Sequence, residues 1–581
     1  MTSQKKSCRN CKAEFTIEPE DFAFYQKIKV PAPTWCPQCR LQRRLIFQNE
    51  RALYSRPCDL CSKKIISVYH ADAAFPVYCG TCWFSDKWDP LSFGKEFDFS
   101  RPFFEQFSEL TRLVPRIALN TEVPKNVNSP YVNLAGPMKN SHLVFYASNV
   151  EDSLYCTNIF FSKDCVDCTK IDQTEISYEL VNCCQCYGSR WSTDCSASFN
   201  LLFCRNCVNC ADCFGCVNLR HKKNCWFNEQ LTPSEYKKRL SEFNSSSRKE
   251  VENVRQRARD FWLSHPTQFI HGHENENVSG DYIDNSKNVH HSFQVLGAEN
   301  VKFGYWLNMA GAKDCYDYSN WGENSDLVYE CNNSGQNTHN AKFSLGSWVG
   351  ANWEYCDTVN QCHDCFGCIL LRGKSNCILN KQYTPQAYAT LRANIVEHMH
   401  RTEEYGQFFP PTLSPFAYNE SSAQQFFPLT KQQAVERGYK WREPEGKSHM
   451  ITLRASKIPD DTAAVHDSIL KEVIECKHKG RCAEQCTQAF TVIPKELAFY
   501  RKHNLPLPVL CPNCRHYARM QDITPMRLHP RQCMCDYKVY KNETKHKHHE
   551  SGRCPNEFET SYAPDRPEIV YCEKCYQAEV V

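Results

Sequence analysis

The sequence predicts a mainly β protein with two duplicated β-solenoid-like repeat blocks, each with a helical cap, flanked by treble-clef or zinc-ribbon modules. Two nested duplications indicate this plan. Residues 212–240 return at 364–392 with 15 of 29 identities, and residues 11–40 return at 486–515 with 14 of 30. Between these modules, Asn or Asp followed by a small residue recurs, often at intervals of 12. Strand–turn units at such a short period bury a core only when they stack, as in a solenoid.

The duplications and the composition divide the chain into nine parts. These are a treble-clef zinc module (1–52), a zinc ribbon (53–90), an aromatic junction with a cap helix (91–125), β-solenoid repeat block 1 (126–231), a helical cap and linker (232–274), β-solenoid repeat block 2 (275–383), a helical cap and linker (384–475), a second treble-clef zinc module (476–530) and a Cys/His zinc module (531–581). In the junction we expect a helix that Ser100 caps and that runs to about Leu113. Thr232 and Thr384, each followed by Pro, should begin the cap helices.

Composition and charge exclude several classes of protein. With 69 basic and 66 acidic residues the net charge is +3, so any contact with nucleic acid must be local. No run of about 18 apolar residues is present. The first residues, MTSQKKSCRNC, lack the apolar segment of a signal peptide, so we expect a cytoplasmic protein with no membrane partner. Many of the 38 cysteines form CxxC pairs, which in a reducing compartment indicate metal ligands.

Two quartets of cysteines near the N-terminus have the spacing of structural zinc sites. The first is Cys8, Cys11, Cys36 and Cys39, and the second is Cys58, Cys61, Cys79 and Cys82. Two CxxC pairs supply four thiolates, which suits the tetrahedral geometry of Zn²⁺. In the first quartet, a hairpin between the pairs and a helix that begins at the second pair predict a treble clef. Four cysteine ligands leave no open coordination position, which indicates structural rather than catalytic metal.

The C-terminal modules repeat this chemistry with less regular spacing. The returning treble clef has the expected ligands Cys482, Cys486, Cys511 and Cys514, although Cys476 could substitute for Cys482 because the first pair is CxxxC. A last site is expected from Cys554, Cys572, Cys575 and one of Cys533 or Cys535. We expect His546, His548 and His549 in an exposed loop beside it; the alternative is a fourth ligand or a general base on an open zinc. About four structural Zn²⁺ sites are therefore expected.

The terminal modules resemble a known family. The residues that carry this resemblance are CxxC, a Phe, AFY, PxP and CPxCRxxRR, and the family is that of the probable zinc-ribbon domains, which implies zinc binding but no reaction. FFEQF, CFGC followed by NLR, and PNEFETSYAPDRPEIVYCEKCYQ make the whole chain similar to cysteine-rich zinc-ribbon proteins of uncultured ultrasmall bacteria. That second resemblance implies no activity.

Arginines follow the second knuckle of each treble clef. They are Arg40, Arg43, Arg44 and Arg51 in the first copy and Arg515 and Arg519 in the second. A helix that carries such residues can meet the phosphates of RNA or DNA, so nucleic acid is a candidate partner. The alternative is a solvated face, or pairing with local acids such as Glu50.

The repeat blocks contain 20 of the cysteines. In the first block, Cys207, Cys210, Cys213 and Cys216 fall at every third position, as in a metal or iron–sulfur site. We favour a stack of small buried thiols, because free Cys is among the most buried residue types, so an iron–sulfur cluster is not expected. Asn and Asp tolerate left-handed turns and can form ladders between coils. The alternative fold, a β-sandwich or propeller, needs longer and evenly alternating strands.

These features predict a non-enzymatic zinc-binding scaffold in which the solenoids form a rigid rod and the terminal modules bind nucleic acid. A purely protein-binding scaffold is a close alternative. A second alternative is a metal-dependent nuclease or other hydrolase that uses the C-terminal Cys/His module. We assign no catalytic residue, since no repeated pair of carboxylates is present and His290 and His291 are candidates by residue type only.

Overall fold

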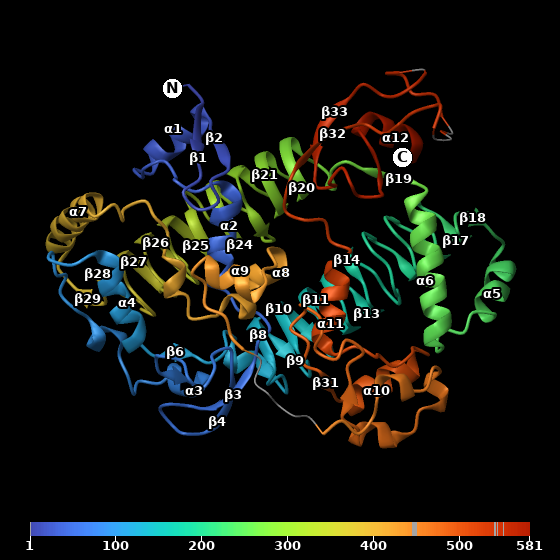
Figure 1. Ribbon diagram of the computed structural model, residues 1–581, viewed down its shortest axis with the longest axis horizontal. Coiled ribbons are helices and arrows are strands. Elements are labelled where there is room, and N and C mark those ends of the chain that lie inside the picture. Colours follow the sequence, from blue (N-terminus) through green and yellow to red (C-terminus); the bar gives the residue numbers. More distant parts are fainter. Residues whose placement is uncertain (1, 444–449, 540–541, 543, 550, 581) are drawn as a thin grey trace.

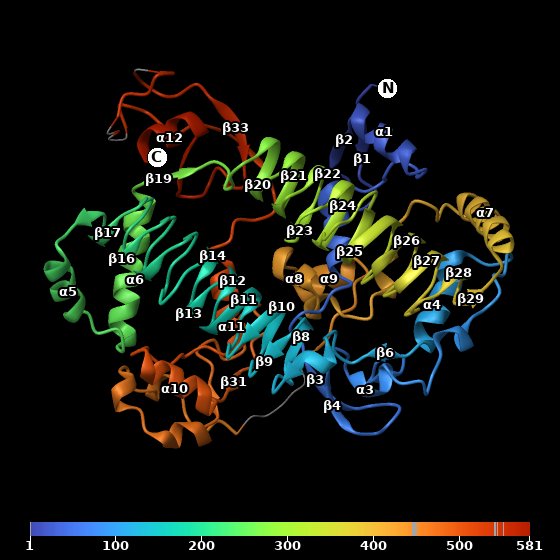
Figure 2. The same cartoon turned by 180° about the vertical axis from the view of Figure 1, so that it is seen from behind.

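The protein is described by a computed structural model that covers residues 2–443, 450–539, 542, 544–549 and 551–580 (Figure 1). Two β-solenoids, each built of parallel strands, cross its middle, and cysteine-rich modules pack around them. The same arrangement is visible from behind (Figure 2). The predicted fold class is confirmed. Within the predicted linker, residues 444–449 lie outside the described residues, as do 540, 541, 543, 550 and 581 of the C-terminal module.

The solenoid strands are short and pair in parallel. The first solenoid contains β7 (Asn126–Val127), β8 (Val132–Ala135), β9 (Met138–Lys139), β10 (Val144–Glu151), β11 (Thr157–Val166), β12 (Thr169–Asp172), β13 (Glu175–Tyr178), β14 (Val181–Cys184), β15 (Phe199–Leu202), β16 (Ala211–Phe214) and β17 (Lys223–Trp226). The second contains β20 (Glu276–Asp284), β21 (Lys287–Leu296), β22 (Glu299–Lys302), β23 (Tyr305–Leu307), β24 (Lys313–Trp321), β25 (Tyr329–Lys342), β26 (Trp348–Glu354), β27 (Asn360–Phe366) and β28 (Ser375–Ile378).

The other elements belong to the modules and the caps. They are β1 (Gln4–Ser7), β2 (Glu14–Ile17), α1 (Pro19–Lys27), α2 (Pro37–Leu45), β3 (Tyr54–Pro57), β4 (Lys64–Ser67), β5 (Val77–Tyr78), α3 (Gly80–Trp83), α4 (Phe103–Leu113), β6 (Arg116–Ile117), β18 (Glu229–Gln230), α5 (Pro233–Ser241), α6 (Arg248–Leu263), β19 (Pro266–Gln268), β29 (Lys381–Gln382), α7 (Pro385–Arg401), α8 (Ser422–Phe426), α9 (Lys431–Glu436), β30 (Ile474–Glu475), β31 (Ala489–Phe490), α10 (Pro494–Lys502), α11 (Pro512–Met520), β32 (His529–Gln532), β33 (Glu557–Thr560), β34 (Ile569–Tyr571) and α12 (Glu573–Val580). The described residues also contain seven short 3₁₀ helices.

A regular coil of the first solenoid has 12 residues. Strand pairing joins Phe145 to Thr157, Thr157 to Thr169 and Thr169 to Val181, one coil apart each time. The interval of 12 in the sequence is therefore the length of one coil. Some coils of the second solenoid are one or two residues longer, as where β22 pairs with β24 and Glu299 lies opposite Lys313.

Left-handed residues at every third position decide which side chains enter the coil. The φ angle is +52° at Asn182, +52° at Gln185 and +56° at Asp194. The residues that follow Asn182 and Asp194, Cys183 and Cys195, belong to the buried core of the coil. One bend at every third residue makes four bends in a coil of 12. The Asn or Asp motif recognised in the sequence thus marks only some of these bends.

Polar side chains connect successive coils. Outside, Asn288 Nδ2 donates to Asn300 Oδ1 at 3.1 Å, and Asn300 Nδ2 donates to Asp314 Oδ1 at 2.9 Å. Inside, the Ser192 hydroxyl accepts the backbone N–H of Cys204, one coil further on, at 3.0 Å. The outer Asn and Asp ladder was expected from the sequence, whereas the inner contact was not; it gives a buried polar group a partner in the neighbouring coil.

Bulky residues also occupy left-handed bends, which the sequence did not indicate. Trp191 and Phe203, one coil apart, both have φ of +53°. Such a conformation costs about 1–2 kcal/mol for a residue with a Cβ atom. The two rings stack with centroids 4.6 Å apart and planes 13° apart, and both are buried. Burial and ring stacking therefore offset the strain at these positions.

The arginine-bearing helix of the first treble clef packs on the second solenoid. Helix α2 lies against β24 and β25 (Figure 1). Arg40 Nη2 lies 2.8 Å from Asp317 Oδ2, and Arg44 Nη1 lies 3.2 Å from Asp317 Oδ1. Arg43 Nη2 lies 2.9 Å from Glu330 Oε2. All of these side chains are at most 4% exposed, so the helix is attached through buried charge pairs.

The second treble clef makes the same contact with the first solenoid. Helix α11 lies against β12. Arg515 Nη1 lies 2.5 Å from Asp167 Oδ2, and Arg519 Nη1 lies 2.8 Å from Asp167 Oδ1. Arg515 also donates to Tyr500 Oη at 3.0 Å and to Glu496 Oε1 at 3.4 Å. Each clef therefore docks on the solenoid that lies farther from it in the sequence.

The solenoids touch side by side, so the prediction of one rigid rod is wrong. Tyr146 of the first solenoid packs edge-on against Trp306 of the second, with ring centroids 6.0 Å apart. Lys170 Nζ lies 5.1 Å from the centroid of Trp306. Tyr282 Oη donates to Asp194 Oδ1 at 2.8 Å. Burial at this contact lowers the pKa of Lys170 to about 7.

Helices cover the last coil of each solenoid, as predicted. Thr232 and Thr384 are the N-caps of α5 and α7, and their hydroxyls accept the N–H groups of Glu235 and Ala387, both at 3.3 Å. Before each helix the chain reverses, because β18 pairs antiparallel with β17 and β29 with β28. This reversal covers the last strand edge, which would otherwise offer open pairing groups.

The junction helix α4 differs from the sequence prediction at its start. It begins at Phe103 rather than at Ser100, which instead donates its hydroxyl to Asp98 at 2.7 Å. The carboxylate of Glu404 accepts the N–H groups of Phe103 and Phe104, both at 2.8 Å. A residue 300 positions away in the sequence thus caps the helix, which no local pattern could have indicated.

Replacing either central carboxylate should destabilise the protein strongly, because two buried guanidinium groups each lose one charged partner. We expect Asp167→Ala and Asp317→Ala each to lower the free energy of unfolding by about 3–5 kcal/mol. Urea denaturation of metal-replete protein measures this effect. The control is Glu105→Ala, which removes an exposed partner of Arg101 and should cost less than about 1 kcal/mol. Similar small effects in all three variants would contradict the role of the buried pairs.

Candidate metal centres

The first treble clef brings its four predicted cysteines together. Cys8 and Cys11 lie in the turn between β1 and β2. Cys36 is the N-cap of α2, and Cys39 lies in its first turn. The four Sγ atoms lie within 4.8 Å of one another. The local sequence explains this geometry, since Pro after Cys36 suits the first position of a helix.

These thiols differ in pKa: that of Cys36 is lowered, whereas the hydrogen bond with Cys36 raises the pKa of Cys39 and burial raises that of Cys11. The backbone N–H of Cys36 donates to Cys8 Sγ at 3.2 Å, and Asn10 Nδ2 donates to Cys39 Sγ at 3.3 Å. Hydrogen bonding from the Cys39 thiol lowers the pKa of Cys36 to about 5. The N-terminus of α2 also stabilises negative charge at this position.

The same backbone contact recurs in all four of the predicted cysteine sites. The N–H of the third cysteine donates to the sulfur of the first in the pairs Cys36–Cys8 (3.2 Å), Cys79–Cys58 (3.3 Å), Cys511–Cys476 (3.3 Å) and Cys572–Cys533 (3.2 Å). In each site the third cysteine directly precedes a helix and the fourth lies in its first turn. The four sites are therefore built in one way.

The spacing of the sulfur atoms fits one tetrahedral ion per site. The Sγ–Sγ distances are 3.7 Å for Cys11–Cys36, 3.9 Å for Cys61–Cys79, 3.9 Å for Cys476–Cys514 and 3.9 Å for Cys554–Cys572. A tetrahedron with metal–sulfur bonds of about 2.3 Å has edges of about 3.8 Å. Several cysteine groups of this protein can thus bind a metal ion.

In the third site, the structure places Cys476 where Cys482 was expected. Cys476, Cys486, Cys511 and Cys514 form the group of four. Cys476 follows β30, as Cys8 follows β1, and it is fully buried. Cys482 is half-buried beside the group, with its Sγ 3.7 Å from Cys514 Sγ. Five thiols thus lie around a site with four coordination positions. The N–H···S contact shared with the other sites favours Cys476 over Cys482 as the ligand.

The last module contains two overlapping groups. Cys533, Cys554, Cys572 and Cys575 form one, and Cys535, His546, His549 and Cys575 form the other. The sequence left open which of Cys533 and Cys535 is a ligand; the structure places each in a different group. The expectation of an exposed histidine loop is wrong, because His546 is 1% exposed and the other two histidines are half-buried.

The arginines predicted to bind nucleic acid face the solenoids instead. Five of them are at most 6% exposed: Arg40, Arg43, Arg44, Arg515 and Arg519. The sixth, Arg51, is half-buried and donates to Thr157 Oγ1 at 2.7 Å. The partners of the five buried arginines are carboxylates of the coils and of α10 rather than Glu50. The interpretation of these residues as phosphate contacts is wrong, because the arginine face of each helix is its packed face.

Cysteines inside the coils differ from those of the modules. Cys207, Cys210, Cys213 and Cys216 lie in the apolar core of the first solenoid, and each thiol donates to the carbonyl two residues earlier, at 3.3–3.5 Å. In the second solenoid, burial raises the pKa of Cys331 to about 12. These thiols act as small core side chains, as the sequence suggested.

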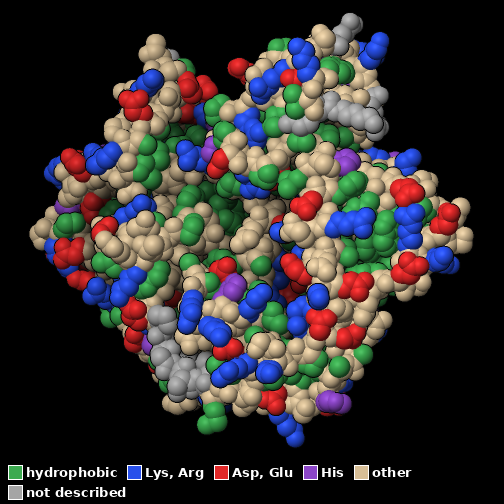
Figure 3. Space-filling model, turned by 45° about the vertical axis from the view of Figure 1, so that its right-hand side comes forward, with side chains coloured by type: hydrophobic (Ala, Val, Ile, Leu, Met, Phe, Trp, Pro, Cys, Tyr) green, Lys and Arg blue, Asp and Glu red, His purple; other side chains and the backbone are tan. Residues whose placement is uncertain are grey.

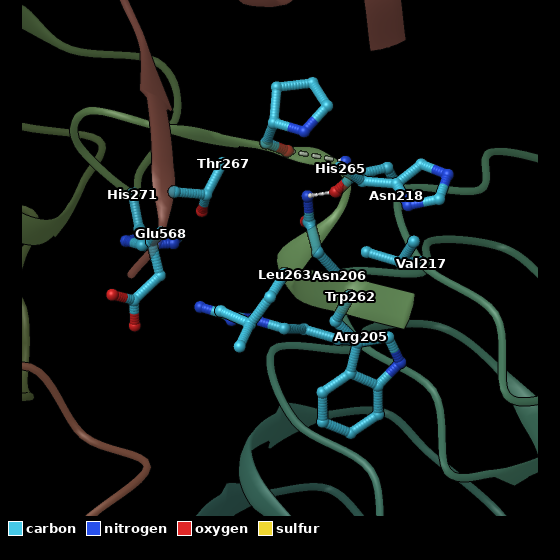
Figure 4. A pocket seen from close by; sticks show the side chains of 11 residues that line it. Arg205, Asn206, Val217, Asn218, Trp262, Leu263, His265, Thr267, His271 and Glu568 are labelled. Carbon is cyan, nitrogen blue, oxygen red and sulfur yellow. Dashed lines mark hydrogen bonds between the residues drawn. The ribbon is translucent and has the colours of Figure 1, made fainter. Parts of the chain in front are cut away.

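Two cavities lie among the described residues. A small cavity of about 10 Å³ lies beside β19, with room for about one water molecule. Figure 4 shows its wall, where Asn206 Nδ2 donates to Asn218 Oδ1 at 2.8 Å and Asn218 Nδ2 donates to the Pro266 carbonyl at 2.7 Å. A wider groove of about 580 Å³ contains Arg116 and Arg442, but both are paired with carboxylates.

One face of the molecule carries mixed charge (Figure 3). On the face shown in Figure 3, basic and acidic side chains of the described residues alternate without a broad basic area. His290 and His291 lie on the second solenoid, where burial lowers the pKa of both, and His291 stacks on Phe303. Among the described residues, no helix is both long enough and apolar enough to span a bilayer.

Comparisons with known proteins leave the chain without an assigned family. No protein-family model matches the sequence, and no curated protein matches it significantly. One similar solved structure is a "putative acetyltransferase" from Desulfovibrio desulfuricans G20, with 8% identity and a TM-score of 0.11 over 46% of this chain and 70% of that chain. At this TM-score the likeness carries no argument about fold or activity.

Two serine variants separate the candidate ligands of the third site. We expect Cys476→Ser to lower the metal content by one ion per chain, because its sulfur holds the position that Cys8 holds in the first site. Cys482→Ser should leave the metal content unchanged. Elemental analysis of the purified full-length protein measures both. The opposite result would restore Cys482 as the ligand.

Proposed function

We propose that the protein is a non-enzymatic, zinc-dependent scaffold in which two metal-bound treble clefs hold two solenoids together. One observation carries this proposal: a ligand and a docking arginine are consecutive residues in each clef. Cys39 precedes Arg40 in α2, and Cys514 precedes Arg515 in α11. An ion that fixes the first turn of the helix therefore also directs the arginine toward its buried carboxylate.

Zinc is the ion that this donor set suits best. Four cysteine sulfurs at tetrahedral spacing are the usual ligands of structural Zn²⁺, which has no redox chemistry of its own. Thiolates bind only after they lose a proton, and the helix N-terminus and the N–H···S contacts favour that state. Free thiols of this number also fit a reducing compartment such as the cytoplasm.

A structural role fits the all-cysteine sites better than a catalytic one. A catalytic zinc keeps one position open for water or substrate, whereas four cysteines fill all positions. The main contacts of α2 and α11 with the solenoids are buried charge pairs. Displacing one partner of such a pair leaves the other charge buried and unpaired, which is strongly destabilising. The hydrolase alternative has no support of this kind from the described residues.

We further propose a protein partner on the open faces of the first solenoid. Tyr187 and Phe199 lie one coil apart and are 45% and 54% exposed, and Phe161 is 54% exposed. Exposed aromatic side chains of this kind are enriched in protein–protein interfaces. Nucleic acid is the weaker alternative, because the arginines that suggested it are buried.

Removing the metal should release the clef helices from the solenoids. With a chelator, we expect faster amide hydrogen exchange in α2 and α11 and in the coils that they cover, β24, β25 and β12, because unfixed helices cannot hold their arginines in place. Exchange mass spectrometry measures this. Cys58→Ser is the control. It alters a metal site in a different module, so hydrogen exchange in α2 and α11 should stay unchanged. Loss of metal with unchanged protection of α2 and α11 would contradict the scaffold proposal.

A salt series tests the alternative partner. We expect no binding of fluorescent single-stranded RNA or duplex DNA to the zinc-replete protein at physiological salt, because the clef arginines are occupied. A nucleic-acid binder would show affinity that falls steeply with the logarithm of the salt concentration. That outcome would return nucleic acid as the partner and would require a different basic surface.

A further inference from the structure

The C-terminal module gathers seven metal-binding side chains in one cluster. They are Cys533, Cys535, Cys554, Cys572, Cys575, His546 and His549. One group of four is formed by cysteines only and the other by two cysteines and two histidines, and Cys575 belongs to both. We propose that this cluster binds two divalent metal ions, with the Cys575 thiolate as the bridge between them.

The number of ligands matches such a centre. Two tetrahedral ions have eight coordination positions together. One bridging thiolate fills two of these positions, so seven side chains complete both ions. The sequence offered these residues as a single site with one cysteine left over. The structure removes that surplus, because Cys533 and Cys535 lie in different groups.

The distances of the second group form the edges of one coordination tetrahedron. Cys535 Sγ lies 3.4 Å from His546 Nδ1 and 3.4 Å from His549 Nε2. The two histidine nitrogens are 3.3 Å apart, and His549 Nε2 is 3.5 Å from Cys575 Sγ. With metal–sulfur bonds of about 2.3 Å and metal–nitrogen bonds of about 2.0–2.1 Å, the sulfur–nitrogen edges are about 3.6 Å and the nitrogen–nitrogen edge is about 3.4 Å.

Hydrogen bonds alone do not explain this arrangement. Cys535 Sγ, His546 Nδ1 and His549 Nε2 are each within 3.4 Å of the other two. An imidazole nitrogen either donates or accepts, so hydrogen bonds along all three sides would require one N–H to be shared between two lone pairs. A cation at the centre accepts all of these lone pairs at once.

The surroundings orient the ligands toward a metal ion. His546 turns its other ring nitrogen, Nε2, to Glu579 Oε1 at 2.8 Å, which leaves Nδ1 for the metal. Carboxylate–histidine–metal contacts of this kind are common around metal sites. Asn542 Nδ2 donates to Cys535 Sγ at 3.2 Å. Glu579 and Cys575 both belong to α12, so one helix positions the bridge and the orienting carboxylate.

His548 is the competing residue. Its Nε2 lies 3.2 Å from Cys575 Sγ and 3.6 Å from Cys554 Sγ, close to the all-cysteine group. That group already has four sulfurs, so we assign His548 a hydrogen bond to the bridging thiolate. Five thiolates around two dications leave a net charge of −1, which an N–H donor partly balances. His548 therefore supplies a matched control.

The two-ion centre would connect the loop that carries His546 to the first solenoid. The second ion would hold Cys535, His546 and His549 against α12. On its other side, α12 contacts the solenoid through Tyr576, whose hydroxyl bonds with Asn206 and lies 3.3 Å from Asn218 Oδ1. Strand β34, which precedes α12, pairs with β19. This inference rests on the metal binding of the proposed function but not on its scaffold role.

Metal content and cadmium NMR of the full-length protein test the proposal. After zinc loading, we expect His549→Ala to contain one ion fewer per chain than the parent protein by native mass spectrometry, and His548→Ala to contain the same number. After exchange with ¹¹³Cd²⁺, the parent protein should show two cadmium resonances with mutual spin coupling through the Cys575 sulfur. His549→Ala should lose one of these two resonances and the coupling.

Two results would overturn the proposal. One is an unchanged metal content in His549→Ala. The other is a full set of cadmium resonances without a coupled pair, which would mean separate ions and no bridge. Failure of the scaffold proposal is distinguishable, since it appears as unchanged hydrogen exchange in α2 and α11 after chelation and leaves the NMR result untouched.

Discussion

Two buried carboxylates, Asp167 and Asp317, connect the parts of this protein. Each receives two guanidinium groups from a clef helix in a place from which water is excluded. Both occupy left-handed bends, with φ of +55° and +52°, which turn the side chain out of the coil. The bend that forms the solenoid therefore also forms the docking point. Because unpaired buried charge is costly, clef and coil are stable only together.

The repeat architecture was predictable because its physical cause is local. A left-handed bend suits Asn and Asp, and the side chain that follows it into the coil must be small. Both residue types therefore recur in the sequence, often at intervals of 12. The finer period of three residues was not visible. Many bends are occupied by residues such as Trp191, Phe203 and Tyr155, whose left-handed conformation depends on contacts with the next coil or with a clef.

The docking of the clefs was not predictable in the same way. An arginine-bearing helix beside a zinc knuckle looks the same in sequence whether it faces phosphate or a buried carboxylate. One signal was present: Arg40 and Arg515 occupy the same position of the duplicated module. The place of Cys476 was also hidden, because the loop from Cys476 to Cys486 is longer than its counterpart in the first clef, and only strand pairing shows which cysteine follows the strand.

The cysteines show how one residue type serves two purposes in one chain. Inside the coils, thiols donate to carbonyls two residues earlier, as Cys156 does to Leu154 at 3.3 Å, which requires the protonated form. In the modules, the first cysteine of each site accepts an N–H from the third, and the third precedes a helix, which favours the thiolate. Some coil thiols also accept an N–H, but they keep the carbonyl contact. A metal ion must displace a proton from each ligand, and the helix N-terminus beside each module site favours that loss. The helix that follows the third cysteine of every module site thus distinguishes these sites from the cysteines of the coils.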